Sequence, residues 1–372
     1  MKSAGVSFVG SSFLLFFICA VVPTTSRAQT SSTGRLEFAY AVDQNTNAVL
    51  GYKVGTTGAL TPLATPSFHA GVAPNSIAID PSGRFVYVVN LLSDNVSGYA
   101  ISADGTLKPV PGSPFPAGSG PGWITIDPTG RFVYVANCAD LCSGLGQGSV
   151  SGYAINKSTG TLTAIPGSPF SAEQIPYAVT VDQTGSFAYV ANFRSGTISI
   201  FKIDQCSGSL WASTQSVPTG GSDPIALTLD PHGRFLYVTN TGSNNVSAFA
   251  VESNGVLKTV PGSPFASGNS TQGIVVSSSG EFLYVTAGFG VLGYSIETSG
   301  QLVPLAGSPF PASGFLVSLG QDKRGHYLYG AASAAGVDAF KLDPTTGKLT
   351  TVTGTPFATH GNAASVTTAI GR

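Results

Sequence analysis

The residues best suited to acid–base chemistry in this 372-residue chain are two histidines and one aspartate. His69 and His360 stand in loop-like segments, and Asp43 follows an apolar run that ends at Val42. Two imidazoles and a carboxylate can exchange protons with a substrate or hold a metal ion. The alternative is that both histidines are solvated loop residues. We predict His69, His360 and Asp43 as candidate catalytic residues, and we predict no metal and no cofactor.

A second group combines aromatic rings with one cation: Trp123, Tyr177, Phe193 and Arg194. Aromatic faces beside a guanidinium suit a sugar or another flat ligand. Ordinary packing between neighbouring elements is the alternative. We predict these four residues as candidate ligand-binding residues.

The short motifs of common catalytic sites are missing from the sequence. It contains no Gly-x-Ser-x-Gly, no His-Glu-x-x-His and no Gly-x-x-x-x-Gly-Lys phosphate loop. Only 9% of the residues are charged, and the formal net charge is -1. This composition provides no basic face for nucleic acid. With 47 glycines, 24 prolines and many short apolar runs, it favours an all-β chain with many turns.

The first 28 residues have the pattern of an export signal. Lys2 supplies a positive charge, residues 13–22 form the apolar core, and Ala28 ends a short run with small residues. That core is shorter than the roughly 20 residues needed to span a bilayer, although an uncleaved anchor is the alternative. We predict a signal peptide at 1–28, a linker at 29–34, and a secreted or periplasmic protein with no membrane contact after cleavage.

A repeat organises the rest of the chain. A tight turn precedes a short apolar strand in DPSGRFVYVVN from Asp80, DPTGRFVYVAN from Asp127, DQTGSFAYVAN from Asp182 and DPHGRFLYVTN from Asp230. The central tyrosines of the strong and weak copies are Tyr40, Tyr87, Tyr134, Tyr189, Tyr237, Tyr284 and Tyr329. Each interval holds four strand-like runs, which is the content of one propeller blade. We therefore predict a single seven-bladed β-propeller of four-stranded antiparallel blades over residues 35–372.

The two ends of the repeat region indicate how the ring closes. The chain enters at the second run of a blade, and it finishes with ASVTTAI from Ala364, which has the character of a first run. We predict that this last strand completes the first blade. The tyrosine strands are apolar on both faces, which fits a blade covered by two neighbours rather than a sheet with one wet face.

Strand order assigns the loops to two faces. Turns between the first and second runs, and between the third and fourth, lie on one face and repeat closely. Asp80, Asp127 and Asp230 belong to these turns, and we interpret them as structural. The opposite face carries the irregular loops, of which the longest spans residues 138–148. We predict that any binding surface lies on this irregular face.

Cysteine positions favour one local disulfide. Cys138 and Cys142 share the long irregular loop, whereas Cys206 lies in a turn on the other face. A strand of five or six residues separates the faces by roughly 17 to 20 Å, and a disulfide needs Cα atoms within about 7 Å. We predict a disulfide between Cys138 and Cys142.

The repeated DPxGRFxYVxN phrase, with the Tyr-Val-Thr-Asn tetrapeptide at 237–240, resembles the lactonase-type seven-bladed propellers, the family of the propeller 6-phosphogluconolactonases. The resemblance implies the propeller fold and lactone hydrolysis. It also implies a histidine just after proline at the start of inner strands and an acid after the tyrosine strand. Here Tyr177 and Ile225 follow the prolines, so no family catalytic residue can be transferred. The positions of the acid hold Leu91, Cys138, Phe193 and Thr241.

Two functions remain open at this point. The first is a binding or interaction module without catalysis, which takes a carbohydrate, a lactone or a cell-wall ligand and is a monomer. The second is a lactone hydrolase with a non-standard site formed by His69, His360 and Asp43.

Overall fold

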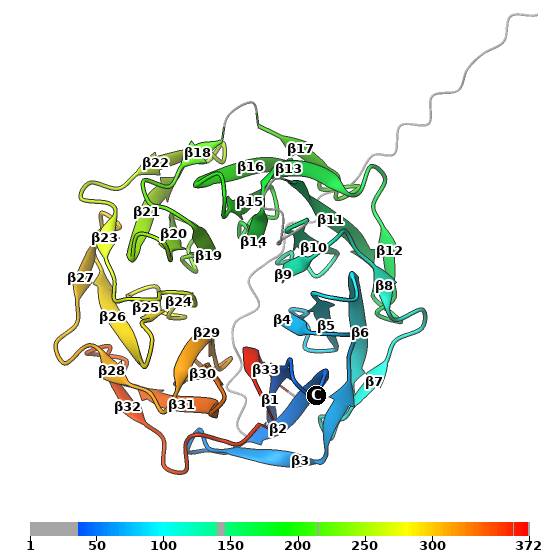
Figure 1. Ribbon diagram of the computed structural model, residues 1–372, viewed down its shortest axis with the longest axis horizontal. Helices are drawn as coiled ribbons and strands as arrows, with labels where there is room; N and C mark the ends of the chain where they lie inside the picture. The colour runs from blue at the N-terminus through cyan, green and yellow to red at the C-terminus, as the bar shows by residue number, and fades with distance from the viewer. Residues whose placement is uncertain (1–35, 140–145, 214–215, 360, 371–372) are drawn as a thin grey trace, which may run out of the picture. The chain divides into compact units, whose positions relative to one another are not determined.

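The computed structural model describes residues 36–139, 146–213, 216–359 and 361–370. Within these ranges the regular elements are β-strands, and they form seven antiparallel sheets around a ring (Figure 1). The predicted all-β, seven-bladed propeller is confirmed. A search of the same ranges for a helix long and apolar enough to cross a membrane gives none.

The strands of each blade are given from the centre of the ring outwards. Blade 1 contains β33 (Ala363–Ile370), β1 (Glu37–Asp43), β2 (Ala48–Val54) and β3 (Leu60–His69). Blade 2 contains β4 (Pro74–Ile79), β5 (Phe85–Asn90), β6 (Asn95–Ile101), β7 (Leu107–Pro109) and β8 (Phe115–Pro116). Blade 3 contains β9 (Pro121–Ile126), β10 (Phe132–Asn137), β11 (Gln147–Ile155), β12 (Leu162–Ala164) and β13 (Phe170–Gln174). Blade 4 contains β14 (Pro176–Val181), β15 (Phe187–Asn192), β16 (Thr197–Ile203), β17 (Leu210–Ala212) and β18 (Val217–Pro218).

The remaining blades follow the same order. Blade 5 contains β19 (Pro224–Leu229), β20 (Phe235–Asn240), β21 (Asn245–Val251), β22 (Leu257–Thr259) and β23 (Phe265–Ala266). Blade 6 contains β24 (Ile274–Val276), β25 (Phe282–Thr286), β26 (Gly290–Ile296), β27 (Leu302–Pro304) and β28 (Phe310–Pro311). Blade 7 contains β29 (Phe315–Gln321), β30 (Tyr327–Ser333), β31 (Gly336–Leu342) and β32 (Leu349–Thr351).

The ring closes as the sequence predicts. Strand β33, from the end of the chain, pairs antiparallel with β1, from its beginning, and Tyr40 lies opposite Thr367. Blade 1 is therefore assembled from both ends of the propeller (Figure 1). Unfolding this blade breaks the connection between the first and last parts of the ring.

The outer run of a blade differs from the expected single strand. In blades 2 to 6 the described residues form two short strands there, such as β7 and β8, and both pair with the third strand of the blade. The Gly-Ser-Pro-Phe turn interrupts the run because proline has no N–H to donate. The turn serine replaces the lost ladder contact, since the backbone N–H of Gly98 donates to Ser113 Oγ at 2.9 Å.

The second strand of each blade forms the core. All six residues of β5, β10 and β20 are buried, so both faces of these strands pack against neighbouring blades. The central tyrosine of every copy has no exposed surface. This explains why the tyrosine strands do not alternate between apolar and polar residues.

Each central tyrosine also binds the next blade. Its hydroxyl donates to the carbonyl oxygen of a turn glycine there, at 2.6 to 3.1 Å. We call these contacts the interblade tyrosine bonds. They join Tyr40 to Gly105, Tyr87 to Gly160, Tyr134 to Gly208, Tyr189 to Gly255, Tyr237 to Gly300, Tyr284 to Gly347 and Tyr329 to Gly58. The last bond runs from blade 7 to blade 1, so the series closes with the ring.

The acceptor of each bond must be glycine. Gly300 has a φ of +85°, and a Cβ there would lie 2.5 Å from the ring of Phe235 in the preceding blade. A side chain is thus disfavoured both by backbone conformation and by the ring packed against it. This requirement explains why glycine recurs in the Gly-x-Leu pattern of the sequence.

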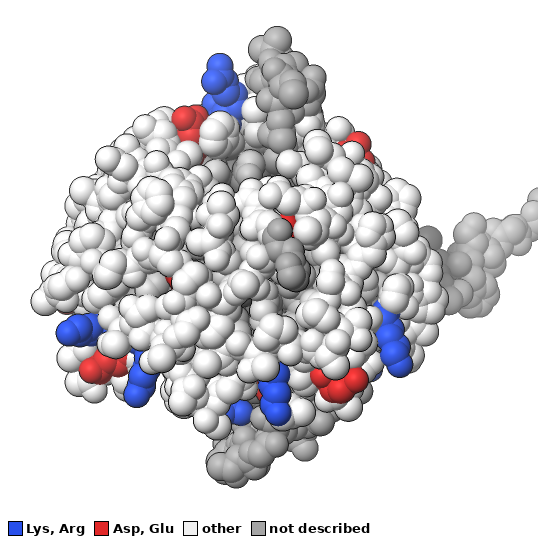
Figure 2. Space-filling model, turned by 60° about the horizontal axis from the view of Figure 1, so that its bottom comes forward, with Lys and Arg blue, Asp and Glu red and all other residues white. Residues whose placement is uncertain are grey.

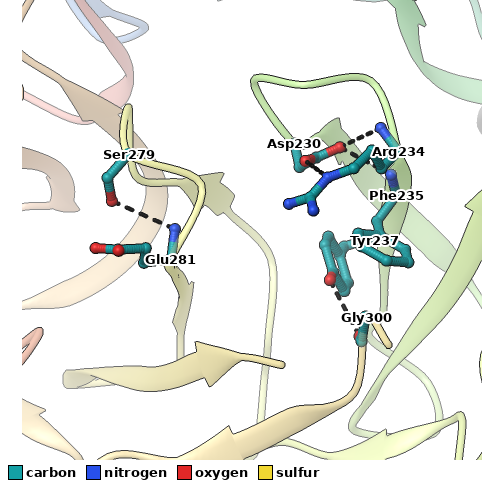
Figure 3. Close-up of polar contacts among 7 residues, drawn as sticks. All are labelled: Asp230, Arg234, Phe235, Tyr237, Ser279, Glu281 and Gly300. Carbon is teal, nitrogen blue, oxygen red and sulfur yellow. Dashed lines mark hydrogen bonds and ion pairs between the residues drawn. The ribbon is translucent and has the colours of Figure 1, made fainter. Parts of the chain in front are cut away.

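The repeated turn holds the tyrosine strand in place (Figure 3). In blade 5, Asp230 Oδ1 accepts from the backbone N–H groups of Arg234 and Phe235, and the Arg234 side chain pairs with Asp230 Oδ2 at 3.3 Å. In blade 6 a serine takes the place of the aspartate, and Ser277 Oγ accepts from the N–H of Phe282 at 3.1 Å. The turn aspartates are structural in the sense predicted.

Candidate ligand pocket at the channel mouth

A β-bulge begins the inner strand of most blades. The register of β4 against β5 skips one residue between Pro74 and Ser76, so Asn75 has no partner across the ladder. A bulge re-aims the side chain of the extra residue, and bulges are frequent beside binding sites. Five other blades have the same register shift, and in each of them one residue of the inner strand has no partner on the second strand. These residues are Gly122, Tyr177, Ile225, Val317 and Ala364.

In blade 6 the corresponding place belongs to Gln272, just ahead of β24. Its backbone N–H donates to Thr286 Oγ1 at 3.0 Å. We call the seven residues the mouth ring, one from each blade. The mouth ring consists of Ala364, Asn75, Gly122, Tyr177, Ile225, Gln272 and Val317.

A pocket of about 280 Å³ lies inside the mouth ring. Six of the seven members line it, and Trp123 lines it from blade 3, where the ring member is a glycine. The remaining lining residues are Gln44, Ala226, Asn362 and Ala363. Because the bulges stand where the inner strands begin, this pocket lies on the face predicted to be irregular.

Side-chain amides form a connected chain along one side of the pocket. Asn362 Nδ2 lies 3.4 Å from Gln44 Oε1, and Gln44 Nε2 donates to Asn75 Oδ1 at 2.9 Å. Asn75 Nδ2 then donates to the carbonyl oxygen of Gly122 at 2.7 Å. These contacts fix the orientation of the amides before any ligand arrives, which lowers the ordering cost of binding.

Aromatic rings line the pocket from blades 3 and 4. Trp123 and Tyr177 line the pocket, and the rings of Tyr177 and Phe193 are 6.2 Å apart and tilted. Trp123 also packs against apolar residues of blades 3 and 4, so its side chain both contributes to the core and lines the pocket. Arg194 is exposed and lies outside the lining. The structure thus brings three of the four predicted ligand-binding residues to one place.

Packing behind the pocket explains the glycine in the mouth ring. A Cβ on Gly122 would lie 2.9 Å from Cys138 Sγ and 3.2 Å from the Tyr177 carbonyl oxygen. The Cys138 thiol is buried and contacts the Pro176 carbonyl oxygen at 3.3 Å. Its burial raises the pKa of Cys138 to about 12, and burial also raises the pKa of Tyr177. Both groups are neutral at physiological pH.

The predicted catalytic residues have different surroundings. Asp43 is fully buried, and its Oδ1 accepts from the backbone N–H groups of Asn45 and Thr46. His69 is exposed at the end of β3, two strands away, and both residues lie beside Ala48 in register. No hydrogen bond between them is found in the described part of the chain. His360 lies outside the described residues, so this set stays a prediction.

The predicted disulfide also reaches beyond the described residues, because Cys142 falls within 140–145. It stays a prediction. Within the described ranges, no group of three or more His, Cys, Asp or Glu side chains could hold a metal ion.

Charged side chains are scarce around the pocket. Among its described lining residues there is no Lys, Arg, Asp or Glu. Figure 2 shows one side of the molecule, on which most of the visible Lys, Arg, Asp and Glu side chains lie towards the edge and small acidic areas are also visible nearer the middle. The pocket therefore offers amides, aromatic rings and a phenol.

Sequence reasoning missed the four amide side chains of the pocket, which are Gln44, Asn75, Gln272 and Asn362. A signal for Asn75 was present, since it follows the proline that begins an inner strand, as Tyr177 and Ile225 do. Bulges were the missing step, because only a bulge turns this position towards the channel.

The fold and the pocket define a seven-bladed propeller with a small polar pocket at its channel mouth. The sequence matches the model of the family described as lactonase, 7-bladed beta-propeller, over residues 28–222. That match covers more than half of the chain, so the protein belongs to this family, and the resemblance seen in the sequence is confirmed. A search of curated proteins finds no match.

Solved structures share the fold. The Pseudomonas aeruginosa periplasmic gluconolactonase is 18% identical, with a TM-score of 0.78 over 91% of this chain and 100% of that one. A Bacteroides uniformis protein, a candidate 6-phosphogluconolactonase, is 20% identical, with a TM-score of 0.75 over 90% and 99% of the two chains. A Desulfotomaculum acetoxidans protein of unknown function is 18% identical, with a TM-score of 0.66 over 85% and 95%. At these identities the likeness concerns the fold alone.

Proposed function

We propose that this protein is a binding module that takes a small hydroxylated ring, a carbohydrate or a lactone, in the mouth pocket. One observation carries the proposal: side chains from all seven blades converge on a pocket built from amides and two aromatic rings. Amides both donate and accept hydrogen bonds, and aromatic faces pack on the apolar face of a sugar ring. A volume of about 280 Å³ fits a ligand of this size.

Binding without hydrolysis is favoured by the chemistry of the lining. Opening a lactone at neutral pH requires a base or a metal to activate water. The described lining residues include no carboxylate, imidazole or thiol. The thiol behind the pocket, Cys138, is protonated because burial raises its pKa to about 12.

Lactone hydrolysis is the second candidate, and membership of the lactonase family favours it. In this case His69, His360 and Asp43 are the proposed catalytic residues. Asp43 supports this candidate in one respect: its Oδ2 is buried and has no hydrogen-bond partner within the described ranges.

The proposal also places the protein outside the cytoplasm, as a monomer. The export pattern at 1–28 supports secretion, and so does the name of the Pseudomonas aeruginosa protein, a periplasmic gluconolactonase. A cell-wall glycan is within the proposed ligand class.

Calorimetric titration of sugars and sugar lactones into the purified protein, together with proton release from the lactones, tests both candidates. We expect saturable binding without turnover, weakened in Trp123→Ala and in Gln272→Ala. Trp211→Ala is the matched control, because Trp211 is 65% exposed and lies outside the pocket lining. Turnover lost in His69→Ala, His360→Ala or Asp43→Asn would establish the hydrolase instead. Absence of both binding and turnover contradicts both candidates.

A further inference from the structure

The uncharged lining of the mouth pocket bears on which ligands can enter it. Groups that bind phosphate in proteins are arginine, lysine, a metal ion or the N-terminus of a helix. The described lining contains neither cation, and the described ranges contain no helix. A phosphate moved into this pocket would lose its hydration without an opposite charge in return.

A buried acidic side chain, Asp43 at the end of β1, stands next to pocket-lining residues. Asp43 precedes Gln44 and pairs in register with Ala363, and both of these residues line the pocket. The Asp43 side chain is buried, and its Oδ2 has no hydrogen-bond partner among the described residues. A buried carboxylate next to pocket residues repels an anionic ligand, and burial of the Asp43 side chain reduces the screening of this repulsion by water and salt.

The remaining groups of the lining suit neutral partners. The Asn75 amide accepts from Gln44 Nε2 and donates to the Gly122 carbonyl oxygen. Burial raises the pKa of Tyr177, so its hydroxyl remains protonated in the physiological range. The Gln272 amide and the rings of Trp123 and Tyr177 can then contact ligand hydroxyls and the apolar face of a ring.

We propose that the mouth pocket selects uncharged hydroxylated rings and rejects their phosphorylated forms. This inference rests on the proposed binding function and defines its substrate class. It separates this chain from any member of its family that takes a 6-phosphorylated sugar lactone. A phosphate ester differs from its parent sugar only by the charged group, so the pair measures the discrimination directly.

The protein offers its own reporter for the test. It contains two tryptophans, Trp123 in the pocket and Trp211 on the outer strand β17. In Trp211→Phe, fluorescence comes from Trp123 alone. We would titrate this variant with glucose and glucose 6-phosphate, ribose and ribose 5-phosphate, and glucono-1,5-lactone and its 6-phosphate.

We expect at least one neutral probe to change Trp123 emission saturably, and its phosphate ester to bind at least tenfold more weakly. A phosphate ester that binds as tightly as its parent, or more tightly, overturns this inference and leaves the proposed function standing. No response to any pair overturns both. The three outcomes are distinguishable in one set of titrations.

A charge placed in the mouth ring provides the complementary test. Gln272→Lys adds a cation to the pocket wall, and we expect it to reduce the discrimination against the phosphate ester at least threefold. Thr163→Lys adds the same charge at an exposed position on the outer strand β12, and we expect no change. Equal effects of the two lysines would contradict a local electrostatic origin.

Discussion

The interblade tyrosine bonds and the mouth ring each have one position per blade, but the first position is the same residue in every blade and the second differs from blade to blade. At the first position all seven blades carry the same residue, tyrosine, with a glycine acceptor in the next blade. At the second position the seven blades carry seven different residue types. The contact between neighbouring blades has the same geometry seven times, so it requires the same residue types each time. A position that faces the channel has no such requirement, and its residue type can vary to contact a ligand.

The largest effect is expected from breaking the ring that both regions depend on. Deleting residues 363–370 removes β33, leaves β1 with an unpaired edge inside blade 1, and exposes the apolar residues that pack on it. We expect the cooperative thermal transition, followed by circular dichroism, to disappear. Addition of a synthetic 363–370 peptide should restore part of it. A truncated protein with an unchanged Tm would contradict closure through this strand.

Alkaline pH should weaken all interblade tyrosine bonds together. Burial raises the pKa of each central tyrosine well above its usual value near 10. The unfolded chain therefore loses these protons first as the pH rises. Stability contributed by the protonated phenols is complete below about pH 10, and it falls above that by up to about 1.4 kcal/mol per tyrosine and pH unit.

Tyrosinate absorbance checks this prediction. We expect most of the ionisation signal to appear together with unfolding, at a pH above 10. Gradual ionisation of the central tyrosines in a protein that keeps its β-sheet signal would contradict their burial at the blade interfaces.

A single glycine pair separates backbone strain from contact with the neighbouring blade. Gly300 and Gly307 both have positive φ, +85° and +81°, but only Gly300 has an aromatic ring in the way. We expect Gly300→Ala to lower the free energy of unfolding by about 1 to 3 kcal/mol more than Gly307→Ala does, the usual cost of overpacking. Denaturant titration of both variants measures the difference. Equal losses would mean that Phe235 moves aside freely.

The same contrast explains what the sequence could predict. The blade number, the closure by ASVTTAI and the structural role of Asp230 followed from repetition, because a contact needed in every blade recurs as a residue in every copy. The mouth ring has no such recurrence. Asn75 and Gln272 share neither type nor flanking residues. A bulge places Asn75 at the pocket, whereas Gln272 reaches it from the segment just ahead of β24.

Sequence reasoning also had difficulty in predicting which residues from distant parts of the chain meet in one pocket. Trp123 and Tyr177 were grouped because both stand near the start of inner strands of adjacent blades, and both line the pocket. The amides of Gln44 and Asn362, which complete the pocket from blade 1, come from opposite ends of the chain and meet only through the pairing of β1 with β33.

Two variants, each assayed for stability and for binding, test most directly whether the interblade tyrosine bonds serve stability and the mouth ring serves binding. Tyr237→Phe removes one interblade bond, and we expect a loss of about 1 to 3 kcal/mol in the free energy of unfolding with ligand affinity unchanged. Gln272→Ala alters the mouth ring, and we expect an unchanged Tm with affinity for the neutral sugar reduced at least fivefold. The opposite result, affinity lost in Tyr237→Phe and stability lost in Gln272→Ala, would contradict the separation of the repeated interblade tyrosine bonds from the ligand pocket.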